Sequence, residues 1–198
     1  LQRANNDYTT IDLEHAEELA YRELIDSIRY IPLGDECGVM GNIANIITYK
    51  GRFYIQEEQF DRVFIYDDTG RCLKKIDNKG RGPGEYLRIE AIDINTEKEE
   101  LMLVDGMSDK LFFYDLGGNF KSIHSIRYFQ TENTLCLRDS VFLHISAPSQ
   151  NFGNEGLYGY ALVLSKGNEN FLKGYRYLPL QVGYKGGGQI FKGYERSC

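Results

Sequence analysis

Carboxylates that could bind a cation or a polar partner occur at matching positions of two segments. Glu57 and Asp61 lie four residues apart, and Asp105 and Asp109 repeat this spacing 48 residues later. Carboxylate oxygens are the ligands that calcium prefers, so equivalent loops could hold a cation. An Asp in a turn also has a local role, because its side chain accepts backbone N–H bonds. We favour this local role, predict no cofactor and keep calcium as the weaker alternative.

A basic residue follows each repeated Asp. Arg62 follows Asp61, and Lys110 follows Asp109. If the two segments are copies of one structural unit, these four residues lie on one rim, where they could contact a polar ligand or a protein. The alternative is that Arg62 and Lys110 extend along a strand edge and keep their charged ends in water.

The three histidines show no spacing that is typical of catalysis. His15, His124 and His144 lie far apart, and the sequence contains no G-x-S-x-G motif. A packed or surface histidine is therefore the better interpretation of each. An enzyme would have to assemble its site from dispersed residues, so we lean against an enzyme.

The four cysteines do not form a metal-binding motif. Cys37, Cys72, Cys136 and Cys198 include no C-x-x-C pair and have no neighbouring His. This spacing argues against a zinc site, and we predict no metal. A chain of this size does not need disulfides, and an isolated cysteine is more often a small buried apolar residue, but the sequence leaves disulfides open.

Charge and hydropathy exclude two classes of protein. The formal net charge is −6, and no cluster of Lys and Arg stands out, so we predict no nucleic-acid binding. No run of about 18 apolar residues is present, so we predict no transmembrane segment. Residues 1–10 lack the pattern of a signal peptide, so an export signal would have been removed upstream.

An internal repeat sets the fold. Shifting the sequence by 48 residues aligns Phe53–Cys72 with Leu101–Phe120 without a gap. The identical pairs are Asp61 and Asp109, Phe64 and Phe112, Tyr66 and Tyr114, Asp67 and Asp115, and Gly70 and Gly118.

Each copy predicts four short strands. Two apolar runs form a hairpin, and the turn after it has an Asp that can cap it and a Gly for positive φ. Aromatic residues of these strands should fill the space between units: Phe53, Tyr54, Phe64, Tyr66, Phe112, Phe113 and Tyr114. The predicted strands are 43–49, 52–55, 62–66 and 72–76, then 89–94, 101–104, 110–114 and 120–126. Four antiparallel strands in 40 to 50 residues are typical of a β-propeller blade.

The sequence therefore predicts an all-β fold of about three to four blades. We expect units at about 43–86, 87–128 and 133–178, and the start of a fourth at 188–198. Residues 27–198 form the partial propeller, in which 27–33 is an edge strand and 147–156 an inserted loop. Residues 1–26 are an N-terminal extension with a short helix, because acids follow Thr9 and Thr10.

The segment 79–86, KGRGPGEY, separates the first two units. We interpret it as an inter-blade turn, in which the glycines allow a sharp reversal and Arg81 or Glu85 could pair with a neighbouring blade. It resembles the G-x-G-P-G-E-[FY] linker of NHL-type repeats. With the YIPL segment 30–33 and the FIYD-x-x-G ending at 64–70, it is similar to the Bacteroidetes six-bladed β-propeller family.

This resemblance implies an exported protein in the periplasm or at the cell surface, often with a lipoprotein signal, which this sequence lacks. A six-bladed ring needs more chain, because residues 27–198 hold only about 3.6 units of this length. We favour a fragment or shortened product over an open array or one that pairs its blade edges in a homo-oligomer.

We predict a binding or protein-interaction module for a protein, saccharide or small polar ligand. A propeller lyase or hydrolase, with or without a metal, that has its site at the channel mouth is the alternative. The loop after residue 146 departs from the repeat, and such loops often carry specificity. The candidate binding residues are Asp61, Arg62, Arg81, Glu85, Asp105, Asp109, Lys110, Asn151 and Tyr158.

Overall fold

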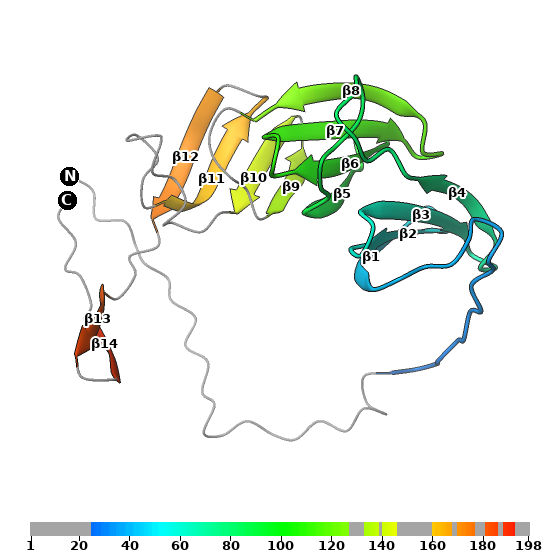
Figure 1. Ribbon diagram of the computed structural model, residues 1–198, viewed down its shortest axis with the longest axis horizontal. Helices are drawn as coiled ribbons and strands as arrows, with labels where there is room; N and C mark the ends of the chain where they lie inside the picture. Colours follow the sequence, from blue (N-terminus) through cyan, green and yellow to red (C-terminus); the bar gives the residue numbers. More distant parts are fainter. Residues whose placement is uncertain are drawn as a thin grey trace. The chain divides into compact units, whose positions relative to one another are not determined.

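The computed structural model describes residues 25–126, 133–138, 140–145, 160–167, 170–176, 181–185 and 188–192. Every regular element in these residues is a β-strand, as predicted (Figure 1). The chain divides into two units, Leu1–Ile31 and Pro32–Cys198, and all the described strands belong to the second. The helix predicted within 1–26 and the loop predicted at 147–156 lie outside the described residues.

Three four-stranded antiparallel sheets follow one another along the chain, each with its strands in sequence order. Blade 1 consists of β1 (Ile43–Tyr49), β2 (Arg52–Glu57), β3 (Arg62–Asp67) and β4 (Cys72–Ile76). Blade 2 consists of β5 (Ala91–Asn95), β6 (Glu100–Asp105), β7 (Lys110–Asp115) and β8 (Phe120–Ser125). Blade 3 consists of β9 (Asn133–Arg138), β10 (Val141–Ile145), β11 (Tyr160–Lys166) and β12 (Asn170–Arg176). A separate hairpin pairs β13 (Gln181–Lys185) with β14 (Gly188–Lys192).

The strand register confirms the repeat. Arg52 pairs with Asp67 in blade 1, and the residues 48 positions later, Glu100 and Asp115, pair in blade 2. The register of β3 with β4 shifts between Ile65 and Tyr66, and that of β7 with β8 shifts at the equivalent position. Blades 1 and 2 therefore share both their pairing and their irregularity, which is expected of two copies of one unit.

The turns after β3 and β7 form as predicted. The Asp67 carboxylate accepts the N–H groups of Thr69 and Arg71, at 3.0 and 3.1 Å. The Asp115 carboxylate does the same in blade 2. Gly70 adopts a φ of 89°, a conformation that is costly for a residue with a Cβ.

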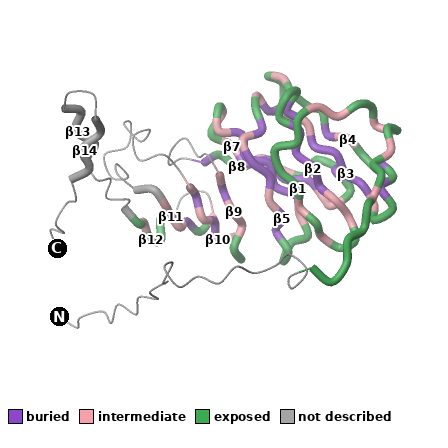
Figure 2. The backbone as a smooth tube through the Cα atoms, turned by 90° about the horizontal axis from the view of Figure 1, so that it is seen from below, coloured by how far each residue is buried: buried purple, intermediate pink, exposed green. Residues whose placement is uncertain are grey.

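The core lies between successive blades. One apolar cluster combines residues of blade 1, such as Tyr54, with residues of blade 2, such as Phe112. A second cluster joins blade 2 to Phe142 of blade 3. Figure 2 shows this burial along the facing strands of the blades. Of the aromatic residues predicted to fill these spaces, Tyr54, Phe112, Phe113 and Tyr114 lie in the two inter-blade clusters. The prediction is wrong for Phe53, Phe64 and Tyr66, which pack in a third cluster on the other face of blade 1.

The first strands of the three blades lie next to one another. β5 contacts both β1 and β9. The backbone N–H of Cys136 in β9 donates to the Asp93 carboxylate of β5 over 2.6 Å. This placement makes β1, β5 and β9 the inner strands of successive propeller blades.

The linker 79–86 is an inter-blade turn that is anchored by Tyr86. The buried Tyr86 hydroxyl donates to the Asp61 carbonyl oxygen at 2.8 Å and accepts the Asn78 N–H at 3.1 Å. Of the two residues that could pair with a neighbouring blade, Arg81 and Glu85, the second instead accepts the Gly82 N–H with its carboxylate at 2.7 Å within the linker. A Cβ on Gly80 would lie 2.0 Å from the same carboxylate, so Gly80 serves this close approach.

A disulfide joins Cys37 to Cys72, with a Cα–Cα distance of 5.9 Å. The expectation that isolated cysteines are more often unpaired is therefore wrong for this pair. The disulfide, with Met40 and Phe53, borders a cluster of Ile55, Phe64 and Tyr66. Segment 34–40 is thus fixed against the face of blade 1 that blade 2 does not cover. Cys136 is a free thiol.

The edge strand predicted at 27–33 is absent, since these residues have no regular structure. An alternating pattern forms a strand only where a second strand offers backbone partners, and no strand among the described residues pairs with this segment. The third unit predicted at 133–178 contains the four strands β9 to β12. The predicted start of a fourth unit contains β14, which pairs only with β13 in the described part of the chain.

Reduction of the Cys37–Cys72 disulfide should destabilise the protein by about 3 kcal/mol, because the bond closes a loop in the unfolded chain. Urea denaturation with and without dithiothreitol measures this difference. The double variant Cys37→Ala/Cys72→Ala should show no further effect of the reductant. Cys136→Ala should respond to the reductant as the wild type does, and an equal midpoint in both conditions for the wild type would contradict the assignment.

Tyr86→Phe should lower the free energy of unfolding by about 1–3 kcal/mol, because it leaves the buried Asp61 carbonyl and Asn78 N–H without their partner. Tyr49→Phe is the matched control. Its hydroxyl donates to the Thr96 carbonyl at an exposed position, so its loss should cost less than about 0.5 kcal/mol. Equal losses in chemical denaturation of the two variants would show that Tyr86 is not the anchor of the linker.

Candidate functional site

A polar pocket of about 370 Å³ lies where blade 1 meets the chain entering blade 2. Three segments form it: the residues at the start of β1, the end of β2 with the β2–β3 turn, and the residues immediately before β5. Its lining residues are Asn42, Ala44, Gln56, Glu58, Gln59, Asp61, Arg88, Ile89 and Glu90. Amide and charged side chains predominate, so the pocket is suited to hydrogen bonding with a polar ligand.

Glu57 shapes the β2–β3 turn. Its side chain is fully buried, and its carboxylate accepts the N–H groups of Gln59 and Phe60. Arg62 donates from Nε to the same carboxylate at 2.9 Å, and its guanidinium lies 4.5 Å from the centre of the Phe60 ring. The predicted turn-capping role of Asp61 is therefore wrong in this turn, because Glu57 performs it from four residues earlier.

Asp61 connects the turn to the next blade instead. Its carboxylate accepts the Ile89 N–H at 3.1 Å and pairs with the Lys79 ammonium at 2.5 Å. Its backbone has a φ of 56°, a conformation that Asp tolerates better than most residues. Asp61 therefore holds Ile89 in the wall of the pocket.

Gln56 is the most deeply buried polar residue of the pocket, with 3% of its surface exposed. Its Nε2 donates to the Ile89 carbonyl oxygen at 3.0 Å. This bond fixes the orientation of the amide, since only the nitrogen can donate. Its Oε1 accepts no hydrogen bond from the residues that the structure describes.

Two of the three carboxylates that line the pocket form ion pairs, and the third does not. Arg88 and Glu90 form an ion pair at 3.3 Å. Asp61 is paired with Lys79. Glu58 is exposed, and within the described ranges its carboxylate forms no ion pair, although its N–H donates to the Asn42 carbonyl. The pocket therefore has one carboxylate more than its cations balance.

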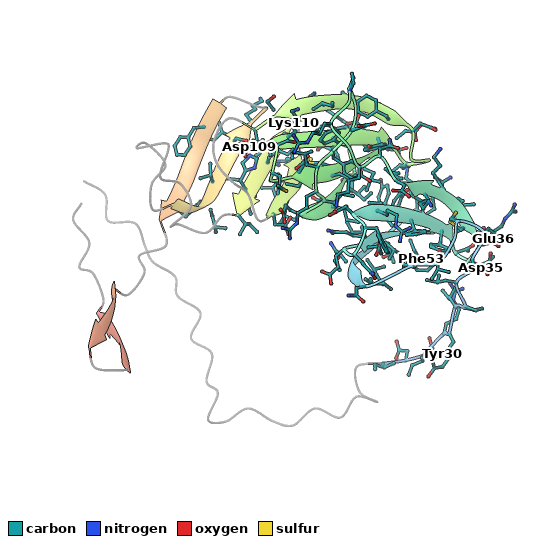
Figure 3. The ribbon with its side chains drawn as sticks, viewed as in Figure 1. Tyr30, Asp35, Glu36, Phe53, Asp109 and Lys110 are labelled. Carbon is teal, nitrogen blue, oxygen red and sulfur yellow. A yellow bond between two sulfur atoms is a disulfide. The ribbon has the colours of Figure 1, made fainter. Side chains whose placement is uncertain are left out.

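The equivalent turn of blade 2 is capped in the same way, with Asp105 in the position of Glu57. Asp105 is buried, and its carboxylate accepts the N–H groups of Met107, Ser108 and Leu87. Asp109 has the same left-handed backbone as Asp61, and Figure 3 shows it beside Lys110 at the start of β7. Asp61 and Asp109 thus take the predicted equivalent positions in blade 1 and blade 2.

The structure brings only one of the predicted binding residues into the pocket, Asp61, with Arg62 in the same turn. Arg81 and Glu85 lie in the linker. Asp105, Asp109 and Lys110 belong to the turn of blade 2, while Asn151 and Tyr158 lie outside the described residues.

Sequence reasoning missed Gln56, Glu58, Arg88 and Glu90. The repeat held a signal for Gln56, because the equivalent residue of the second copy is Val104. Where one copy of a repeat has a polar residue and the other an apolar one, the polar residue indicates a role that is specific to its own blade.

His144, which the sequence predicts to be a packed or surface histidine, is packed inside blade 3. Its Nδ1 is 3.0 Å from the Thr134 hydroxyl and its Nε2 is 2.8 Å from the Ser165 hydroxyl. The side chain is 2% exposed, so a substrate cannot reach this Ser and His pair in the folded blade. Burial lowers the pKa of His144 to about 4. No group of three His, Cys, Asp or Glu residues within the described ranges is placed to hold a metal ion.

Comparison with known proteins gives a family and a fold. A family model described as a domain of unknown function, DUF4934, matches residues 8–191. No curated protein matches the chain. Among the described residues, no helix is long and apolar enough to span a membrane.

Solved structures with a similar fold include a Bacteroides fragilis protein named as a putative exported protein. It matches with a TM-score of 0.69 and 19% identity over 80% of this chain and 44% of its own. The structure of U3-55K gives a TM-score of 0.49 at 11% identity, over 68% and 39% of the two chains. The β-propeller domain of Myceliophteria thermophila Cps50 gives a TM-score of 0.39 at 15% identity, over 74% of this chain and 42% of its own. This chain spans less than half the length of each, and the first match supports the fold alone.

Acid should destabilise the protein through His144. Because its pKa is lower in the folded state than its ordinary value of 6.5, the unfolded state binds more protons between about pH 6.5 and pH 4. Stability should fall by up to about 3 kcal/mol as the pH drops through this range. Denaturant midpoints at several pH values measure the loss, which His144→Gln should remove and His124→Gln should leave in place. An unchanged pH profile in His144→Gln would refute this role.

Proposed function

Because this chain belongs to the DUF4934 family and its described strands form propeller blades, we propose that it is a non-enzymatic binding module of an exported protein. The pocket between blades 1 and 2 is the proposed binding site. No cofactor is required for this function. The partner is a protein or a small polar ligand, such as a saccharide or an amine, that binds in this pocket.

One observation carries this proposal. The pocket exposes polar groups whose hydrogen-bonding capacity the described part of the protein leaves unused, among them Gln56 Oε1 and the Glu58 carboxylate. An acceptor that lines a pocket and has no partner among the described residues is suited to a ligand that brings its own donor.

Two observations support export. The Cys37–Cys72 disulfide is typical of proteins that fold in an oxidising environment. The Bacteroides fragilis protein with a similar fold is named as exported. We place this chain in the periplasm or at the cell surface, with a lipid anchor as the resemblance to the Bacteroidetes propellers implies. The six-bladed NHL-type ring belongs to the same proposal, and KGRGPGEY at 79–86 is the motif that supports it.

Titration of the ¹⁵N-labelled chain with small polar probes tests the pocket. Glucose, acetate, butanol and butylamine would each be added at millimolar concentration. At least one probe should shift the amide signals of Glu58, Gln59 and Ile89 more than those of blade 3, because these residues line the pocket.

Gln56→Val, which installs the residue type of the equivalent position in blade 2, should weaken these shifts while the spectrum stays that of a folded protein. If no probe shifts the pocket signals of the wild type, the proposed site is wrong.

A further inference from the structure

We infer that the pocket between blades 1 and 2 binds a primary ammonium group, carried by a small free amine or by the lysine side chain of a peptide. This inference rests on the proposed binding function of the pocket and specifies its ligand. Three features of the pocket carry it: a fixed and unused acceptor, an excess carboxylate, and the geometry of the remaining acceptors.

Gln56 presents an oxygen, not an N–H, to the pocket. Its Nε2 is committed to the Ile89 carbonyl at 3.0 Å, which leaves Oε1 as the group that is free to interact. The side chain is 97% buried, and its Oε1 receives no donor from the described residues. A ligand that satisfies this oxygen must supply an N–H or O–H group.

The charge of the pocket favours a positively charged donor over a neutral hydroxyl. Asp61 is balanced by Lys79, and Arg88 balances Glu90. Glu58 has no such partner among the described residues, so it adds one negative charge to the site. Hydrogen bonds in which both groups are charged are stronger than neutral ones, and an anionic ligand would be repelled.

An ammonium group matches the acceptors better than a guanidinium. Ammonium is a compact charge with three donors that can address separate oxygen atoms. The pocket offers acceptors on separate side chains, Gln56 Oε1, the Glu58 carboxylate and the amide oxygens of Asn42 and Gln59. A guanidinium holds its donors in a rigid planar fork that suits the two oxygens of one carboxylate, such as Glu58, and it is less able to reach Gln56 Oε1 and the amide oxygens at the same time.

Butylamine and butanol form the decisive pair of probes, because they have the same carbon chain and differ in the ammonium group. Butylamine should bind the wild-type pocket about tenfold more tightly in the NMR titration. Glu58→Gln should remove most of this preference, because it keeps the shape and deletes the charge.

Glu97→Gln is the matched control, because it also deletes one exposed carboxylate. Glu97 lies in the turn after β5, whereas the pocket residue Glu90 lies before that strand, so this variant should leave the preference for butylamine unchanged. Equal affinities for the two probes in the wild type, or an unchanged preference in Glu58→Gln, would overturn the inference.

Two further probes distinguish the sources of the ammonium. A short peptide with an acetylated N-terminus and one lysine should bind more tightly than butylamine if the natural ligand is a lysine side chain, and equally if it is a free amine. Acetylation of that lysine should abolish binding in either case, and retained binding would overturn the inference. If glucose or acetate shifts the pocket signals and butylamine does not, the ammonium ligand is wrong but the binding function stands. If no probe shifts them, both are wrong.

Discussion

The packing of blade 1 against blade 2 is the constraint on which the rest of the structure depends. Each sheet has two apolar faces, and the cluster around Tyr54 and Phe112 removes one face of each from water. The linker must cross from the outer strand of one blade to the inner strand of the next without opening this core. Tyr86 solves that problem, because its ring packs in the cluster while its hydroxyl bonds to the backbone of the β2–β3 turn. Apolar packing and a few buried hydrogen bonds thus fix the same junction.

The pocket is a consequence of this junction. Asp61 and Gln56 both hold Ile89, one through its N–H and the other through its carbonyl oxygen. These bonds place the chain before β5 against the β2–β3 turn, and the space between them is lined by the polar side chains of both. Neither blade could form the site alone. The unused groups of Gln56 and Glu58 are therefore presented by a rigid frame, which lowers the entropy lost when a ligand binds.

The repeat made most of the fold predictable. A 48-residue period with capped turns determined the strands of blades 1 and 2, because strand pairing and turn chemistry act over short distances in the sequence. The site was less predictable, since Arg88 and Gln56 meet only after two blades have packed. The Cys37–Cys72 bond and the irregular 27–33 segment were missed for the same reason. Both depend on which backbone or thiol lies opposite in space, and an alternating pattern contains no such information.

The position of the disulfide also bears on how the chain matures. Both cysteines precede the linker, so in a chain exported as proposed above they would reach an oxidising compartment before any residue of blade 2. Oxidation can then secure the first sheet while the remainder is still being translocated. A sheet locked in this way offers the next one a preformed template, and later blades can add to it in order.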